Sequence, residues 1–480
     1  MAATTQPPHD DKPSLLLWGA LGLAMLLVTG VVAYGAIALL GDDAADASYP
    51  DSWDARVEPF ARAVEAQRRL QFAHPVTVEF LNAKEYDAAV ADELTPVEEW
   101  RAQLVGDSAL LQAVGLIASD SNLLDDVNRL GAAAEGLTSV NYSYQDERIR
   151  IRGTKVTPIV QAQLVHELTH ALQDQRFDTG NRLEMLSRQP DPALAGGLRA
   201  VVEGDAQRTE DAWRKTLPRK QRRAVDRASA AMTRATEKKT RTIPGAVSMM
   251  TVGPYALARS MLDLAVEDSG PAVVDQILVK PPTSEEHLLD PWTFLDDDSV
   301  PRGVKQPGLE PGETKVAEGA VGAAGWLFML GERIPSPAAL TATDGWDGDR
   351  YVAYERDGRS CVRVNYRAET SDDLQEMRRA LVDWAQAGPG DTSATSALAP
   401  RTLVFETCAA PSGGRAHGSA SEDVIMLVDS RIQLATQVLT IGDDHFARCA
   451  TDRIVHRFTA KQLNDPKLTE QFQRVVAPCL

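Results

Sequence analysis

Residues 166–175 read His-Glu-Leu-Thr-His-Ala-Leu-Gln-Asp-Gln, and the first five of them match the pattern H-E-x-x-H. On a helix, positions four apart lie one above the other on the same face, so His166 and His170 can both reach one metal ion. Glu167 lies beside them and can contact a metal-bound water without occupying the metal. The motif therefore predicts a helix that carries two zinc ligands and the catalytic base of a hydrolase.

A catalytic zinc usually has three protein ligands and keeps one position for water. The longer pattern H-E-x-x-H-x-x-G-x-x-H is excluded, because Gln173 and Arg176 stand where it needs glycine and histidine. Asp191 and Pro192 predict the start of a following helix, and Glu203 lies within an apolar run of that helix. A carboxylate there is costly to bury without a partner, so Glu203 is the candidate third ligand; the alternative is a solvated glutamate at the helix edge.

Four further residues are candidates for supporting roles in this site. Tyr255 and His287 are candidates to stabilise an oxyanion. Asp174 and Asp205 follow the second histidine and the glutamate closely enough to be candidates for orienting the metal ligands. Each of the four also has an ordinary interpretation, as a structural residue or a surface carboxylate.

These motifs resemble a known family. The sequences HELTHALQDQ (166–175) and VVEGDA (201–206) are similar to those of bacterial zinc metallopeptidases of the gluzincin type, which share a thermolysin-like catalytic core. Pro254-Tyr255 and residues 281–291 and 345–351 resemble later segments of that group, so the likeness extends from about residue 75 to residue 387.

The resemblance implies a zinc site made of His166, His170 and Glu203, with Glu167 as the base. The chain departs from the pattern of the group at three positions, where the group tends to have Thr, Gln and His: Glu285, His287 and Asp290. These differences concern the segment 281–291 and leave the implied metal site intact.

The N-terminal region contains 26 uncharged residues, from Leu15 to Leu40. About 20 apolar residues of helix cross a bilayer core, so this stretch predicts a transmembrane helix at 15–40 that binds the lipid bilayer. A cleaved signal peptide is the alternative, although its apolar region would be unusually long. Lys12 before the span and Arg56 after it favour a cytoplasmic segment 1–14 and a location in the cell membrane, single-pass, with the C-terminal domain extracellular.

The remaining pattern predicts an α+β fold. After a linker at 41–56, we expect a mostly helical, zincin-like domain with a small β-sheet at 57–335 and an α+β module at 336–480. Further local predictions are a helix at 57–70, strands at 76–80, 351–354 and 424–428, a β-hairpin at 140–152, and loops at 388–400 and 411–423.

The C-terminal module holds every cysteine of the chain. They are even in number, which is consistent with disulfide bonds in an oxidising exterior, and their pairing is not determined by the spacing. Four reduced thiols in a core are the alternative. The candidate disulfide cysteines are Cys361, Cys408, Cys449 and Cys479.

The charge balance is acidic, with 50 Lys+Arg against 68 Asp+Glu and a net charge of −18, which argues against nucleic acid as a partner. One segment differs from this background. Residues 214–241 contain eleven Lys or Arg and two acidic residues. This segment is interpreted as a solvated helix, with contact to anionic lipid, to an acidic partner or substrate, or to another part of the chain as the alternatives.

Together these features predict a membrane-anchored zinc metallopeptidase that hydrolyses peptide or protein substrates outside the cytoplasmic membrane, with a Zn²⁺-bound water activated by Glu167. The alternative is a non-catalytic sensor or scaffold that uses a zincin fold as a binding module. The presence of Glu167 beside the ligands favours the enzyme, because a scaffold has no need for the base.

Overall fold

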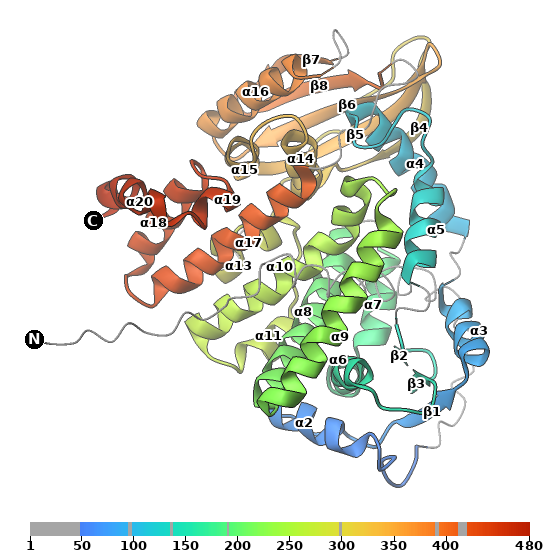
Figure 1. Ribbon diagram of the computed structural model, residues 1–480. Coiled ribbons are helices and arrows are strands. Elements are labelled where there is room, and N and C mark those ends of the chain that lie inside the picture. Colours follow the sequence, from blue (N-terminus) through green and yellow to red (C-terminus); the bar gives the residue numbers. More distant parts are fainter. Residues whose placement is uncertain are drawn as a thin grey trace, which may run out of the picture.

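The computed structural model describes residues 49–94, 98–134, 138–189, 192–296, 300–388, 393–410 and 420–480. These residues form an α+β fold in which a three-stranded sheet and a five-stranded sheet lie at opposite ends of a largely helical body (Figure 1). The prediction of an α+β chain with a small sheet near the H-E-x-x-H helix agrees with this arrangement.

The small sheet has the strand order β1-β3-β2. β2 (Val140–Ser143) and β3 (Arg148–Arg152) form the predicted antiparallel hairpin, and β1 (Thr77–Leu81) pairs in parallel with β3. β2 is therefore an edge strand beside the helices of the body. The helices that precede the hairpin are α2 (Glu58–Arg68), α3 (Ala83–Leu94), α4 (Glu98–Val114) and α5 (Leu123–Ala134).

The helical body follows the hairpin. Its two longest helices, α8 and α10, pack side by side, and α6 packs on α8. Its helices are α6 (Pro158–Phe177), α7 (Thr179–Ser187), α8 (Pro192–Thr216), α9 (Arg219–Thr240), α10 (Gly245–Ser269), α11 (Val273–Val279), α12 (Glu286–Leu289) and α13 (Pro291–Asp296).

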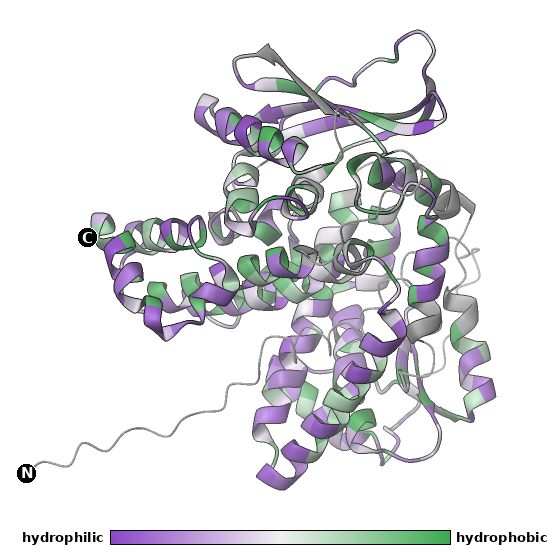
Figure 2. Cartoon of the chain, turned by 45° about the horizontal axis from the view of Figure 1, so that its top comes forward, coloured by the Kyte–Doolittle hydropathy of each residue, from purple (hydrophilic) through white to green (hydrophobic). Residues whose placement is uncertain are grey.

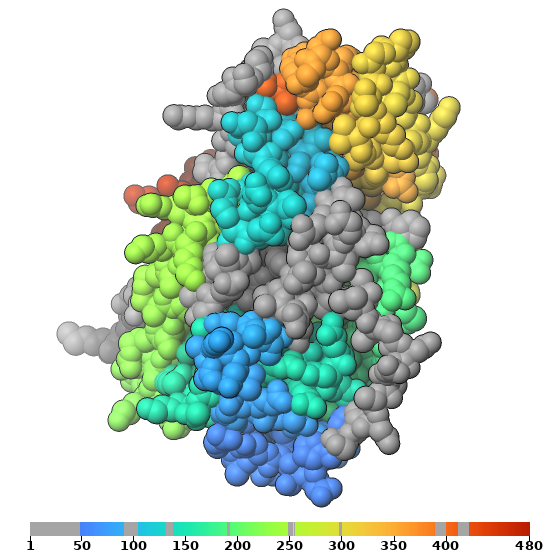
Figure 3. Space-filling model, turned by 90° about the vertical axis from the view of Figure 1, so that its right-hand side faces the viewer, coloured from blue at the N-terminus to red at the C-terminus, as the bar shows by residue number. Residues whose placement is uncertain are grey.

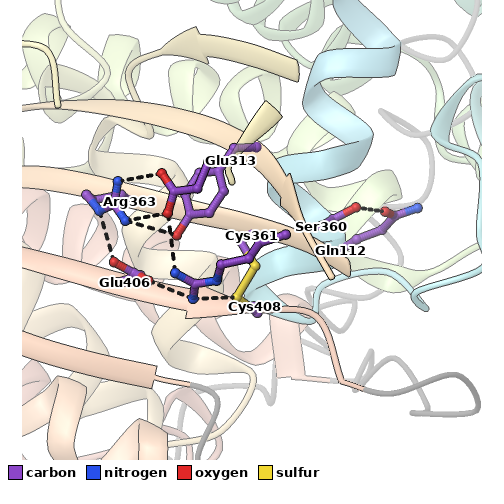
Figure 4. Close-up of a disulfide and its surroundings, with 9 residues drawn as sticks. Gln112, Glu313, Ser360, Cys361, Arg363, Glu406 and Cys408 are labelled. Carbon is purple, nitrogen blue, oxygen red and sulfur yellow. Dashed lines mark hydrogen bonds and ion pairs between the residues drawn. A yellow bond between two sulfur atoms is a disulfide. The ribbon is translucent and has the colours of Figure 1, made fainter. Parts of the chain in front are cut away.

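The large sheet is antiparallel, with the strand order β4-β5-β6-β8-β7. Cys361 on β6 and Cys408 on β8 are directly paired in the ladder and form a disulfide, beside an ion-pair network of Arg363, Glu313 and Glu406 (Figure 4). Its strands are β4 (Thr314–Gly319), β5 (Trp346–Arg356), β6 (Arg359–Ala368), β7 (Ser393–Ala399) and β8 (Thr402–Cys408).

The two faces of the large sheet have different contacts. Val364 and Tyr366 of β6 pack into the main hydrophobic core with α14 (Gly322–Gly331), α15 (Ser336–Thr343) and α16 (Ser371–Gln386). The side chains that alternate with them bond to the preceding segment: Arg363 donates to the carbonyl of Gly308, and Asn365 donates to that of Lys305. In Figure 2, α16 shows purple residues on its outer side and green residues toward the sheet.

The C-terminal helices pack against the body, and the contact between α10 and α17 is extensive. Cys449 on α18 and Cys479 form a second disulfide, so all four predicted cysteines are paired, as 361–408 and 449–479. The C-terminal elements are α17 (Ala420–Leu439), α18 (Asp444–Val455), α19 (Ala460–Leu463), the 3-10 helix η2 (Pro466–Leu468), α20 (Thr469–Val476) and the 3-10 helix η3 (Ala477–Cys479).

The main hydrophobic core extends across the predicted domain boundary at residue 336. One cluster contains Leu110 of α4 and Met261 of α10 together with Trp326 and Trp384, which both make edge contacts with the ring of Phe405. The division into domains at 57–335 and 336–480 stays a prediction, and the packing shows that the two ranges share this core.

The predicted membrane span is corrected. No helix among the described residues is long and apolar enough to cross a membrane. The two longest, α8 and α10, both carry ionisable residues along their length, which hydrocarbon would disfavour. The predicted span itself, 15–40, lies outside the described residues. This finding contradicts the fold class that included a single N-terminal transmembrane helix, and the localisation as a single-pass membrane protein with an extracellular C-terminal domain.

Two local predictions in the C-terminal module were also wrong. Residues 424–428, Val-Ile-Met-Leu-Val, lie within α17 and not in a strand. A short apolar run fits a buried helix as well as a buried strand, and here the packing against α10 decides the outcome. The predicted loop at 388–400 contains β7, which forms an edge of the large sheet.

A buried arginine joins α17 to the helical body and to the large-sheet region. The guanidinium of Arg431 lies 2.8 Å from Asp344 Oδ1, 2.8 Å from Asp452 Oδ1 and 3.6 Å from Asp290 Oδ2. The side chain of Arg431 is 2% exposed, so its charge is balanced by these carboxylates more than by water.

Arg431→Met should lower the free energy of unfolding by about 3–5 kcal/mol, because it leaves partly buried carboxylates without their shared cation. Urea denaturation followed by circular dichroism measures the change. The matched control is Arg378→Met, at an exposed position of α16. Equal stabilities of the two variants would contradict the role assigned to Arg431.

Candidate metal centre

The H-E-x-x-H sequence lies in the middle of α6. The helix starts at Pro158, after Thr157, whose side chain accepts the N–H of Val160, and it ends at Asp178 in a left-handed conformation with φ of 55°. Almost every side chain from Val160 to Gln173 is buried, which is the pattern of a helix surrounded by protein. The two histidines therefore lie inside the molecule.

Glu203 lies on α8, which crosses α10 at very short range. A Cβ atom added to the neighbouring Gly204 would lie 2.8 Å from the backbone nitrogen of Arg259 on α10. Only glycine allows the two helices to approach this closely at this point. The glycine of the sequence VVEGDA thus has a packing function, and it fixes the position of the glutamate that precedes it.

Three side-chain atoms from these two helices converge. Nε2 of His166 lies 3.2 Å from Oε2 of Glu203, and Nε2 of His170 lies 3.5 Å from the same oxygen. The three ligand atoms all lie within 4.8 Å of one another, and all three residues are buried. The structure thus confirms the coarser prediction, that His166, His170 and Glu203 form one group that could hold a metal ion.

The imidazole of His170 is oriented by a chain of hydrogen bonds. Its Nδ1 lies 3.0 Å from Oε1 of Gln173, while Nε2 of Gln173 donates to the Val202 carbonyl and to Oδ2 of Asp205. Because the amide nitrogen of Gln173 is used as a donor, its oxygen must accept, and Nδ1 of His170 carries the hydrogen. Nε2 of His170 then presents a lone pair toward Glu203.

Asp205 is held in turn by Arg68 of α2. Nε of Arg68 lies 2.8 Å from Oδ2 of Asp205, and the Asp205 side chain is fully buried. Asp205, a predicted orienting residue, therefore acts on His170 through Gln173 and does not contact a metal ligand directly. Asp205 is two residues after Glu203 on α8, so its side chain points away from Glu203. Its contact with the ligand group is therefore indirect.

His166 is oriented by a carboxylate that was not predicted. Oε2 of Glu210 lies 3.7 Å from Nδ1 of His166, and Oε1 of Glu210 lies 2.6 Å from the guanidinium of Arg214. Both charged residues are buried on α8. At 3.7 Å this contact is electrostatic and is not a hydrogen bond; the charge of Glu210 favours a hydrogen on Nδ1, which leaves the lone pair of Nε2 facing the ligand group.

The donor atoms fit a cation. With hydrogens on both Nδ1 atoms, the two Nε2 lone pairs and the Glu203 carboxylate face one another with no hydrogen between them. Nε2 of His170 has no hydrogen-bond partner among the described residues. Buried lone pairs that oppose one another are costly, and a metal ion bound by all three would satisfy them together.

The pKa values of His166 and Glu203 also indicate that the ligand group favours a positive charge. Burial by itself would lower the pKa of His166, but Glu203 and Glu210 outweigh burial and raise that pKa to about 10. Burial by itself would raise the pKa of Glu203, yet the two histidines hold it well below its usual range. A proton on His166 can therefore supply the charge that a metal ion would supply in the same place.

Glu167 is held beside the ligand group by the edge strand β2. Its Oε2 accepts the backbone N–H of Tyr142 at 2.8 Å. Burial raises the pKa of Glu167, against the opposing effect of the two histidines and of this hydrogen bond. The predicted base is therefore a buried carboxylate with raised basicity next to the proposed metal position.

Asp174 does not orient a histidine. Its Oδ2 accepts the hydroxyl of Tyr142 at 2.8 Å, and its Oδ1 accepts the backbone N–H of Gly180 at 2.8 Å. Asp174 thus anchors the strand residue whose N–H contacts Glu167. Asp174 is therefore close to the site, but it supports the strand residue that is bonded to Glu167 and does not support a metal ligand.

The two candidate oxyanion stabilisers differ in their surroundings. Burial raises the pKa of Tyr255, and Arg199, to which its hydroxyl is hydrogen-bonded, opposes the rise; the charge of Glu203 also acts on this pKa. Tyr255 therefore lies within the electrostatic range of a metal ligand. His287 is buried in α12 and does not belong to the ligand group. The oxyanion role of both residues stays a prediction.

Two segments outside the metal site also resemble the gluzincin group. Their acidic residues form hydrogen bonds that hold neighbouring helices and strands together. Glu285 accepts the N–H of Ala324 near the start of α14, and Asp290 accepts the N–H of Trp292 at the start of α13. In the later segment, Asp349 accepts the indole N–H groups of Trp346 and Trp326, and the N–H groups of Val321 and Gly322.

Gln173 and Glu210 are the functional residues that sequence reasoning missed. In the sequence, Gln173 stands where the longer zinc motif needs a glycine, and that position gives no signal of an orienting role. Glu210 lies seven residues after Glu203, two helical turns along the same face of α8, and Arg214 follows four residues later. A search for carboxylates at this spacing from the third ligand would have found Glu210.

In comparisons with known proteins, only part of the chain matches a family. Residues 310–425 match the family described as Domain of unknown function (DUF8575), which includes the large sheet and its covering helices. No curated protein and no solved structure matches the chain. The family match covers less than half of the chain and lies outside the metal-ligand helices.

Glu210→Gln should weaken metal binding about 10–100-fold, because residues that orient a metal-bound histidine typically contribute this much to affinity. Competition with a chromogenic chelator measures the affinity for zinc. The matched control is Asp211→Asn: Asp211 is the next residue, is also buried, and pairs with Arg259 at 2.8 Å. An equal loss of affinity in both variants would show a general effect on α8 and contradict the orienting role.

Proposed function

We propose that the chain is a zinc-dependent hydrolase of peptide bonds. The observation that carries the proposal is the convergence of His166, His170 and Glu203 beside a buried glutamate on the same helix. Ligand atoms bound tetrahedrally to zinc at about 2.0–2.2 Å lie roughly 3.3–3.6 Å apart. The two separations from Glu203, 3.2 and 3.5 Å, are close to this range.

The type of ligand also favours zinc. Two imidazoles and one carboxylate are a common ligand set of catalytic zinc sites, whereas calcium and magnesium prefer oxygen ligands alone. A zinc ion held here would act as a Lewis acid toward a peptide carbonyl and make water a better nucleophile at neutral pH. The resemblance to gluzincin metallopeptidases supports the same assignment.

Glu167 would move the proton. One of its oxygens accepts the Tyr142 N–H, which fixes the carboxylate and leaves the other oxygen to accept a proton from the attacking water. Burial raises its pKa, so the carboxylate is a stronger base than an exposed glutamate. The same group would then deliver the proton to the leaving amine.

A second function is favoured by the burial of the site. The two histidines are each 1% exposed, Glu167 is 4% exposed and Glu203 is 5% exposed. A closed site of this kind suits a metal that stabilises a binding module without catalysis. The two functions differ in what they require of Glu167, which is the base of the hydrolase and has no task in a structural site.

Glu167→Gln should keep about one zinc per chain and lower peptide hydrolysis about 10²–10⁴-fold, the usual contribution of a general base. The glutamine can still accept the Tyr142 N–H, so the fold should be retained. Zinc is measured by atomic absorption and hydrolysis with a fluorogenic protein substrate. His170→Ala is the comparison variant and should lose the zinc as well. An active Glu167→Gln variant would disprove the mechanism.

A further inference from the structure

The helix α9 packs directly on the helices that carry the proposed metal site. Amide Nε2 of Gln163 on α6 contacts Sδ of Met232 on α9 at 3.7 Å, one helical turn before the first histidine. Arg214 of α8, which pairs with Glu210, donates to the hydroxyl of Ser229 on α9 at 2.8 Å. The inner face of α9 is therefore part of the support of His166.

The outer face of α9 is strongly basic. The helix has two exposed acidic residues, Asp226 and Glu237, against eight exposed basic residues: Arg219, Lys220, Arg222, Arg223, Arg227, Arg234, Lys238 and Lys239. We call these eight residues the basic face. In Figure 3 the lime-green atoms of this region lie along one edge of the molecule, open to solvent.

Seven of the eight charges of the basic face are not balanced by an ion pair within the described structure. Of its eight residues, all but Lys239 form no ion pair or hydrogen bond with a described side chain. The chain as a whole has more acidic than basic residues, 68 against 50, so acidic partners are abundant. Among the described residues, however, none of these acidic side chains forms an ion pair with the other seven.

This arrangement lowers the stability of the helix. Arg219 and Arg223 are four residues apart, as are Arg223 and Arg227, and like charges at this spacing repel. The first turn of α9 has no acidic residue, although the positive end of the helix dipole favours one. An anionic partner along this face would relieve both effects.

We propose that the basic face binds an acidic segment of the polypeptide substrate; this rests on the proposed hydrolysis of peptide bonds. The helix has 22 residues, which is about 33 Å, so an extended chain of roughly ten residues can lie along it. A segment bound on the outer face of α9 is separated from α6, whose histidines would hold the metal, by the thickness of one helix, about 10 Å. Docking would thus select acidic polypeptides and hold them near the cleavage site.

A polypeptide fits this face better than a membrane or a nucleic acid does. A helix that enters a lipid interface exposes large apolar side chains, and the described residues of α9 expose none. Its apolar residues Val225 and Met232 are buried. A duplex or a bilayer would also approach the acidic remainder of the molecule, whereas a single extended chain can contact α9 alone.

Binding is tested with the Glu167→Gln full chain and a fluorescent peptide of twelve glutamates, by anisotropy at low salt. The triple variant Arg222→Gln, Arg223→Gln, Arg227→Gln should bind about tenfold more weakly, since each exposed charge pair contributes about a factor of two. The matched control neutralises three exposed basic residues elsewhere: Arg378, Arg379 and Lys461. It should bind the peptide like the parent chain.

Equal binding by the triple variant and the control would overturn the proposal. So would tighter binding of phosphatidylserine vesicles or of a 20-nucleotide DNA than of the glutamate peptide. This binding does not require hydrolysis, so a chain that binds the peptide through α9 but cleaves nothing would disprove only the proposed function. In the active chain, the triple substitution should raise KM for a substrate with a glutamate tail, with little change for one with a glutamine tail.

Discussion

The candidate metal centre depends on the opposition of buried lone pairs. Two imidazole nitrogens and one carboxylate oxygen face the same point inside the protein, and no hydrogen lies between them when both imidazoles are neutral and carry their hydrogen on Nδ1. Protein interiors tolerate such an arrangement only when a positive charge is shared among the acceptors. A cation shared among these atoms, whether a proton or a metal ion, would therefore stabilise the relative position of α6 and α8.

The support of this site extends to residues distant in the sequence. His170 is fixed through Gln173 and Asp205 to Arg68 of α2, and His166 is fixed through Glu210 and Arg214 to α9. Each histidine thus belongs to a separate chain of charged and amide groups that ends on a different helix. Movement of either outer helix would change one ligand independently of the other.

Features that depend on the spacing of residues close together in the chain could be predicted from the sequence. The i, i+4 histidines, the apolar setting of Glu203 and the alternation in the hairpin at 140–152 all depend on neighbours along the chain, and all three agree with the structure. The helix at 424–428 was missed because its environment comes from α10. Similarly, the roles of Asp174 and Asp205 depend on residues brought near by folding, namely Tyr142 and Gln173.

The shared hydrophobic core has a consequence for the order of folding during synthesis. Leu110 of α4 is made early, but its cluster includes Phe405 and Val428, which the ribosome adds about 300 residues later. At about 5–20 residues per second this interval lasts on the order of 15–60 s. The apolar face of α4 must remain soluble for that time, so the nascent chain is a strong candidate for chaperone binding until the large sheet has formed.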